Sequence, residues 1–123
     1  MTREEFEHMV QEAFDSLPER FRSSVENVRV IVEDKDSPRT RERIGVRSGS
    51  FLLGLYEGIP LTRRGSHYGM APAIPDTITL YQRNIEAAVR TRQEVTDVVR
   101  EVLIHELGHY FGMTEEEIRR AGY

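Results

Sequence analysis

The amino-acid sequence predicts an α+β protein that forms a single domain, residues 1–123. Apolar residues recur with helical spacing near the N-terminus and again in the last third of the chain, and β-branched or apolar segments lie between them. The composition, 38% hydrophobic and 31% charged, is that of a globular chain with one core and not of a disordered chain. We therefore expect helices at both ends of the chain and strands between them.

The N-terminal segment is predicted to be an amphipathic helix. Thr2 and Glu5 have the spacing of a capping box, which predicts where the helix begins. Pro18 is expected to end it and to open a short second turn over residues 18–24. The apolar positions between these points follow the i, i+3, i+4, i+7 pattern: Phe6, Met9, Val10, Ala13, Phe14 and Leu17.

Three segments have the character of strands. Residues 28–33 (VRVIVE) are β-branched, and residues 51–56 (FLLGLY) form an apolar run typical of a central strand buried on both faces. Residues 76–82 (DTITLYQ) alternate, which favours a strand with one exposed face at the edge of a sheet. The charged residues 34–50 are expected to form a long mobile loop, and the Gly- and Pro-rich residues 57–75 a loop with a functional role.

Composition also excludes several classes of protein. The longest apolar run is too short to span a bilayer, the N-terminus is acidic and lacks the features of a secretory signal, and there is no cysteine for a disulfide or a thiolate metal site. The formal net charge of −4 argues against nucleic acid as a partner, and the arginine cluster of residues 39–47 is interpreted as a solvated loop. We expect a cytoplasmic protein that binds neither nucleic acid nor a membrane.

The last third of the chain is predicted to be helical. Thr91 and Glu94 have capping-box spacing, and Gly112 is expected to stop the helix in the C′ position. Successive residues of an α-helix are turned by about 100°, which places a stripe of valines on the same face as two histidines and a glutamate: Val95, Val98, Val99, Val102, His105, Glu106 and His109. This face is expected to point inward, so its polar side chains need partners or a cleft.

Two histidines one helical turn apart can share a zinc ion. In the sequence H-E-L-G-H, these are His105 and His109, and Glu106 lies where it can accept a proton from a water that zinc activates. The alternative is that they are ordinary helix histidines on the surface or satisfied in the core. The inward direction, Glu106 and the stop at Gly112 together favour one zinc ion per chain.

A catalytic zinc needs a third protein ligand. In the longer pattern H-E-x-x-H-x-x-G-x-x-H, the last position corresponds to Glu115 in this chain, and a carboxylate oxygen is an accepted zinc ligand. The alternative is that Glu115 merely opens a helix, where acidic residues are favoured by the helix dipole. Glu117 is better explained as the capping-box partner of Thr114.

These residues resemble the zincins, and in particular the small bacterial minimal zincin metallopeptidases. The similarity also covers "LLGLYEGIPLTRRGSHYG" and "PDTITLYQRNI", and so extends from about Leu52 to the end of the chain. The resemblance implies a small twisted mixed β-sheet packed on an N-terminal helix and on the H-E-x-x-H helix. It implies His105 and His109 as zinc ligands and Glu106 as the catalytic base, and Glu115 matches an acidic position of the family's motif.

The leading hypothesis is therefore zinc-dependent hydrolysis of peptide bonds in a peptide or an unfolded protein. Residues 76–82 are the best candidate for an edge strand to which extended substrate adds. The side chain that stabilises the oxyanion is left open among four residues: His67, Tyr68, Tyr81 and Tyr110. The alternative is a non-catalytic or conditionally active module of the same fold that acts by binding a partner protein, which could also regulate it.

Overall fold

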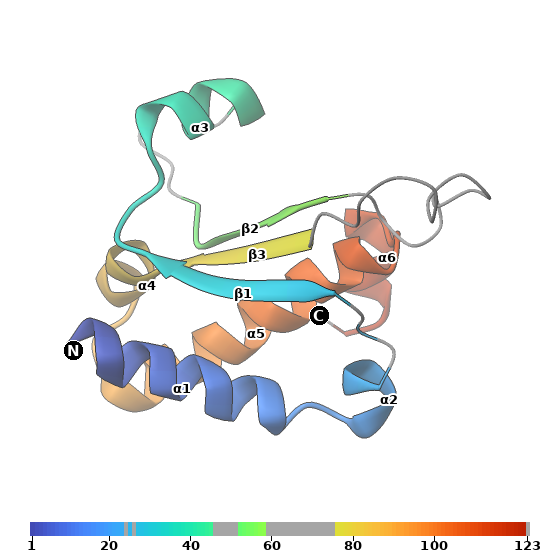
Figure 1. The fold of residues 1–123 in the computed structure, drawn as a ribbon, viewed down its shortest axis with the longest axis horizontal. Coiled ribbons are helices and arrows are strands. Elements are labelled where there is room, and N and C mark those ends of the chain that lie inside the picture. The colour runs from blue at the N-terminus through green and yellow to red at the C-terminus, as the bar shows by residue number, and fades with distance from the viewer. Residues whose placement is uncertain (24, 26, 46–51, 59–75, 123) are drawn as a thin grey trace.

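A computed structural model describes residues 1–23, 25, 27–45, 52–58 and 76–122 (Figure 1). In chain order its elements are α1 (Arg3–Asp15), α2 (Glu19–Arg22), β1 (Val28–Glu33), α3 (Pro38–Ile44), β2 (Gly54–Glu57), β3 (Asp76–Tyr81), α4 (Gln82–Ala88), α5 (Arg92–Tyr110) and α6 (Glu115–Arg120). None of the helices described is long and apolar enough to cross a membrane.

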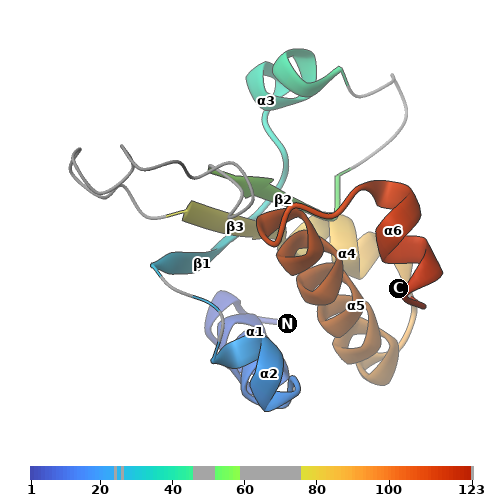
Figure 2. The same cartoon turned by 90° about the vertical axis from the view of Figure 1, so that its right-hand side faces the viewer.

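The three strands form one mixed sheet in the order β1-β3-β2. β1 runs parallel to β3, with Val28 opposite Asp76, and β2 runs antiparallel to β3, with Tyr56 opposite Ile78. Helices α1 and α5 lie together on one side of the sheet, and α3 lies on the other side (Figures 1 and 2). The predicted α+β fold with a small mixed sheet on an N-terminal helix and the H-E-x-x-H helix is confirmed.

The hydrophobic core lies between the sheet and the two helices α1 and α5. The side chains of Phe6 in α1, Ile78 in β3 and Leu103 in α5 are fully buried there. Burying a side chain of this size stabilises the fold by about 1.5–3 kcal/mol relative to leaving it exposed. Along α5 the predicted inward stripe is observed, because Val95, Val99 and Val102 are buried and Val98 is half-buried.

The strand order predicted from the sequence is wrong. DTITLYQ was expected at a sheet edge, but β3 is central and five of its six residues are buried. Its alternation is misleading because threonine is β-branched and fits the interior of a sheet, and Thr79 is only 5% exposed. FLLGLY was expected to be central, but β2 lies at an edge of the sheet formed by the described residues. It is apolar because it packs on α5 and lines a cleft together with that helix.

Two helices were missed. The residues predicted as a long loop contain α3, which begins at Ser37, whose hydroxyl accepts a hydrogen bond from the Thr40 N–H, and ends at Gly45 with a φ of 80°. The density of arginines in this segment favoured a loop, and the helix-capping residues Ser37 and Gly45 were therefore not recognised. Helix α4 follows β3 directly and has no side-chain cap, so no local signal marks it. The predicted second turn after Pro18 is present as α2, whereas most of the loop expected over residues 57–75 lies outside the described residues.

A buried carboxylate, that of Asp36, ties β1, α3, α4 and the start of β2 together. It is 8% exposed and accepts hydrogen bonds from Arg41 and from Asn84, both at 2.8 Å. The Asn84 amide also donates to the carbonyl of Leu52 at 2.8 Å, just before β2. Burial alone would raise the pKa of Asp36, but the hydrogen bonds from Asn84 and Arg41 outweigh it and lower that pKa.

We expect Asp36→Asn to reduce the free energy of unfolding by about 1–2 kcal/mol at pH 7, because charge-assisted hydrogen bonds become neutral ones. A lowered folded-state pKa means that the carboxylate stabilises the fold above its unfolded pKa of about 3.9 and loses this effect as the pH falls through the lower, folded value. Urea unfolding at pH 7 and pH 3 should therefore show a smaller difference between the two proteins at pH 3. The exposed Asp97→Asn is the matched control and should change little at either pH. A difference that grows on acidification would contradict this account.

Candidate metal centre

Helix α5 carries the two histidines, and its ends are set by local sequence. Thr91 caps the N-terminus, its hydroxyl accepting a hydrogen bond from the Glu94 N–H at 3.1 Å. At the C-terminus the N–H of Gly112 donates to the carbonyl of His109, and the N–H of Met113 donates to that of Gly108, both at 2.9 Å. This pair of bonds is a Schellman motif, and the φ of 83° at Gly112 is the left-handed conformation that it requires.

Helix α6 follows this turn and is capped by Thr114 and Glu117. The Thr114 hydroxyl accepts from the Glu117 N–H, and the Glu117 carboxylate accepts from the Thr114 N–H, both at 3.2 Å. The capping box predicted here is therefore present. Glu115, at the first position of α6, is directed back toward α5, where its carboxylate meets the two histidines.

Gly108, inside the H-E-L-G-H motif, lets α6 approach α5. A Cβ atom at this position would lie 2.8 Å from both Cγ1 and Cδ1 of Ile118, which is 2% exposed. Such a distance is too short for a non-bonded carbon–carbon contact, so any larger residue would require the Ile118 side chain of α6 to shift. The glycine between the histidines therefore permits the close packing of α6 on α5.

The structure brings together the three residues predicted to bind metal. Nε2 of His105 lies 3.0 Å from Oε1 of Glu115, Nε2 of His109 lies 2.9 Å from the same oxygen, and all three donor atoms are within 4.8 Å of one another. Donor atoms around a tetrahedral zinc ion, at about 2.0–2.1 Å from the metal, are roughly 3.3 Å apart. The two distances to Glu115 are within a few tenths of an ångström of this value, so the donor set suits one zinc ion.

The electrostatics of Glu115 suit a ligand. Partial burial opposes ionisation, but the hydrogen bond from His105 and the charges of both histidines lower the pKa of Glu115, which favours its ionised form. Its side chain is 61% exposed, against 32% for His105 and 29% for His109, so the three donor atoms meet at the surface of the protein. A metal ion bound there would be open to a further ligand from solvent.

Glu106 lies deeper than the histidines and is held by the sheet. It is 8% exposed, and its Oε1 accepts a hydrogen bond from the backbone N–H of Tyr56 at 2.9 Å. Burial raises the pKa of Glu106, opposed by the charges of the two histidines and by the Tyr56 N–H. Strand β2 comes this close because of Gly54, where a Cβ would lie 2.4 Å from Cγ1 of Val102.

Tyr56 is the residue of this site that sequence reasoning missed. Its hydroxyl donates to Asp76 at 2.7 Å, and its ring contacts that of Tyr110 edge-on with centroids 6.0 Å apart. A signal existed in Gly54, since a glycine inside a strand often marks a close backbone approach. Nothing local, however, indicates that the partner would be Glu106, 50 positions away.

The donor atoms open onto a cleft of about 570 Å³ between β2, the start of α6 and the end of α3. Besides the polar groups described above, four apolar side chains line it: Ile44, Leu52, Leu55 and Met113. Of the four residues considered for oxyanion stabilisation, Tyr81 and Tyr110 are buried and do not contribute to the described lining. His67 and Tyr68 lie outside the described residues.

The chain is similar to known proteins along most of its length. The profile of a family described as zincin-like metallopeptidases matches residues 25–123. Among solved structures, the chain is similar to a conserved hypothetical protein from Thermus thermophilus, with 24% identity, a TM-score of 0.59 and coverage of 98% of both chains. At this identity the similarity shows the fold alone. A search of curated proteins found no match.

Substitution of Gly108 by alanine should weaken zinc binding about tenfold, the size of effect typical of residues that orient metal ligands. The added methyl group displaces Ile118 and with it Glu115, although alanine itself favours the helix. Competition with a chromophoric zinc chelator would measure the affinity. Gly108→Ala/Ile118→Ala, which removes the colliding atoms, should recover part of it, and the exposed Glu116→Ala is the control. Unchanged affinity in Gly108→Ala would mean that α6 does not position a ligand.

Proposed function

This chain belongs to the zincin-like metallopeptidase family, and we propose that it is a zinc-dependent peptidase in which His105, His109 and Glu115 hold the metal and Glu106 is the general base. The observation that carries this proposal is the convergence of three donor atoms within 4.8 Å, beside a buried carboxylate that the sheet edge orients. A helix end with two unrelated histidines would not need a third donor from another helix, nor a buried glutamate between them.

The residues of this chain have separate roles in the proposed reaction. Zinc, when bound, supplies a Lewis acid that polarises the scissile carbonyl and lowers the pKa of a water molecule to about 7. Glu106 accepts the proton of the attacking water and delivers it to the leaving amine. Its Oε1 is fixed by the Tyr56 N–H, so the orientation of the carboxylate is set before substrate arrives, and Oε2 is the oxygen assigned to the proton transfer.

Substrate is proposed to bind along β2. The carbonyl of Leu53 accepts from the Tyr81 N–H, so Leu53 faces β3, and the alternation of an antiparallel strand turns Gly54 and Tyr56 toward the open side of β2 in the described sheet. Their carbonyl groups can receive N–H groups of an extended peptide. The candidate predicted from the sequence, residues 76–82, is excluded because β3 has a neighbour on both sides.

The apolar wall of the cleft supports a preference for apolar side chains beside the scissile bond. Ile44 is 39% exposed, one of the few large hydrophobic side chains left so open among the described residues, and Leu52, Leu55 and Met113 lie around the same cleft. Covering these side chains contributes about 25 cal/mol per Å² of apolar surface removed from water. A peptide or an unfolded protein with apolar residues is the proposed substrate.

Zinc binding is the first test of this proposal. Protein purified and then loaded with zinc should contain about one zinc ion per chain by elemental analysis, as expected for a single three-ligand site. His105→Ala, His109→Ala and Glu115→Ala should each weaken binding at least about a hundredfold, because each removes a direct bond to the metal. The neighbouring Glu116→Ala should bind zinc like the wild type. Binding that survives Glu115→Ala unchanged would remove this residue from the ligand set.

Hydrolysis is tested with Glu106→Gln, which keeps the shape of the side chain and its acceptor for the Tyr56 N–H. We expect this variant to bind zinc normally and to cleave peptides about 10²–10⁴-fold more slowly, the usual contribution of a general base. A library of quenched fluorescent peptides with varied apolar residues would supply the substrates. Equal cleavage by both proteins would point to a contaminant, and zinc binding without cleavage by either would favour the non-catalytic binding module.

A further inference from the structure

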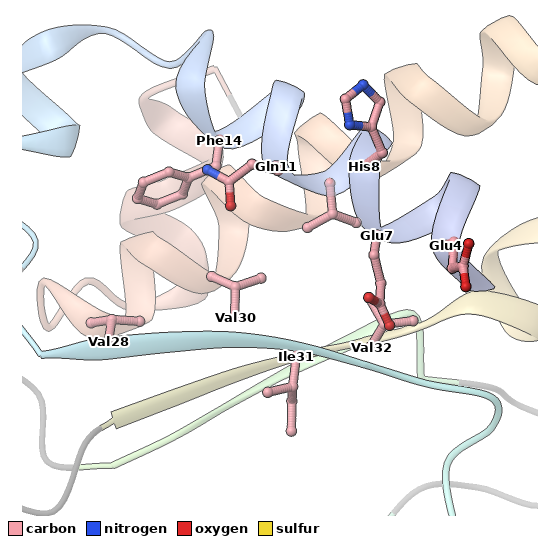
Figure 3. A pocket seen from close by; sticks show the side chains of 10 residues that line it. Glu4, Glu7, His8, Gln11, Phe14, Val28, Val30, Ile31 and Val32 are labelled. Carbon is pink, nitrogen blue, oxygen red and sulfur yellow. The ribbon is translucent and has the colours of Figure 1, made fainter.

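The open edge of β1 lies across the sheet from the cleft and borders a second hollow. Val28, Val30 and Val32 line one side of a groove of about 770 Å³, and α1 forms its other side (Figure 3). These three valines are only half-buried. Figure 3 also shows that Ile31 points to the opposite side of β1 from α1.

The backbone groups of β1 alternate between its two edges. The carbonyl of Asn27 accepts from the Asp76 N–H at 3.0 Å, on the β3 side, whereas the carbonyl of Val32 accepts from the Arg3 guanidinium at 2.8 Å, on the outer side. By this alternation Val28, Val30 and Val32 direct their N–H and C=O groups to the outer edge. In the described part of the chain β1 is the last strand on this side, so these groups form an open template for another strand.

The sequence of β1, VRVIVE, is complementary to itself when it is reversed about Ile31. Arg29 then lies opposite Glu33 of a second copy, and Val30 lies opposite Val32 of the second copy. Val30 and Val32 form a hydrogen-bonded pair in this register, because both face outward, and Arg29 and Glu33 form the closer, non-hydrogen-bonded pair. Shifting the centre by one residue either way places Arg29 opposite Ile31 or Lys35 and removes the charge match.

We propose that two copies of this chain associate through antiparallel pairing of β1, with Ile31 on the two-fold axis, so that their sheets become continuous. The charge complementarity of Arg29 and Glu33 selects a second copy of this chain as the occupant of the edge. The bond from Arg3 to Val32 does not block it, because a carbonyl oxygen accepts two hydrogen bonds. Both clefts stay open, since each lies beside β2 at the far edge of its sheet.

The same groove limits the strength of the dimer. Glu4 and Glu7 of α1 line it, and a two-fold axis at Ile31 brings the acidic sides of the two α1 helices toward each other. Like charges in the interface oppose association. The dimer is therefore weak and depends on protein concentration, and sedimentation velocity should show an increase from monomer to dimer as concentration rises toward about 1 mM.

Engineered cysteines test the register, and the chain has none of its own. In Ile31→Cys the two sulfur-bearing residues face each other across the axis with Cα atoms about 4.5 Å apart, within the range of a disulfide. In the matched control Arg29→Cys, the two introduced cysteines are displaced from each other along the strands by four residues, about 13 Å. Under mild oxidation Ile31→Cys should form a covalent dimer at least roughly tenfold faster than Arg29→Cys. Equal rates, or a faster Arg29→Cys, would overturn the register.

Reversing the charges of Arg29 and Glu33 in separate variants tests whether the partner is a second copy of this chain. Arg29→Glu and Glu33→Arg should each weaken self-association about tenfold or more, because two attractive pairs become repulsive. An equimolar mixture of the two should associate again, since each then faces an opposite charge. Circular dichroism would verify that each variant is folded, and Arg100→Glu on the exposed side of α5 is the control. Wild type that stays monomeric at about 1 mM, or a mixture that associates no better than its components, would overturn the proposal.

Discussion

The hydrogen bond from the Tyr56 N–H to the Glu106 carboxylate is the constraint on which the arrangement of sheet and helix depends. It joins β2 to α5 across 50 positions of sequence at a distance of 2.9 Å. A carboxylate buried to this degree without a donor would cost several kcal/mol, so β2 must present an outward-facing N–H at this point. Only an edge strand can supply it, because in a central strand that N–H belongs to a neighbour. The hydrogen bond that orients the proposed base thus depends on two features of β2. Its edge position in the order β1-β3-β2 leaves the N–H available, and Gly54 lets the strand approach α5.

The donor atoms for metal depend on a different set of interactions. The Schellman turn at Gly112, the capping box of Thr114 and the close contact at Gly108 together place Glu115 over the two histidines. All of these lie within α5, α6 and the turn between them. A substitution that disturbs the sheet edge therefore acts on the base, whereas one that disturbs α6 acts on the metal, although both sets of residues meet in one cleft.

The sequence predicted the local contacts of α5 and α6 well and the contacts that depend on the sheet poorly. The starts of α1, α5 and α6, the inward face of α5 and the capping role of Glu117 are decided by spacing along the chain, and these predictions agree with the structure, whereas α3 and α4 were missed. The convergence of Glu115 with the histidines was a hypothesis from motif register that the geometry supports. Strand order was predicted wrongly, because Thr77 and Thr79 were interpreted as solvent-facing and not as β-branched residues of a central strand. Tyr56 was missed since its role is carried by a backbone N–H, which any residue except proline possesses.

The contacts of the metal centre and of the proposed base differ in sequence separation, and this affects the order in which they form during folding. The donor atoms of His105 and Glu115 are ten residues apart and lie on two consecutive helices, so closing that loop costs little chain entropy. The bond between Tyr56 and Glu106 closes a loop five times as long and requires the sheet to be assembled first. The three donor atoms of the candidate metal centre are thus brought together by more local contacts than those that orient Glu106. Metal binding and catalysis, the two properties proposed for this site, therefore depend on contacts that a substitution can disturb separately.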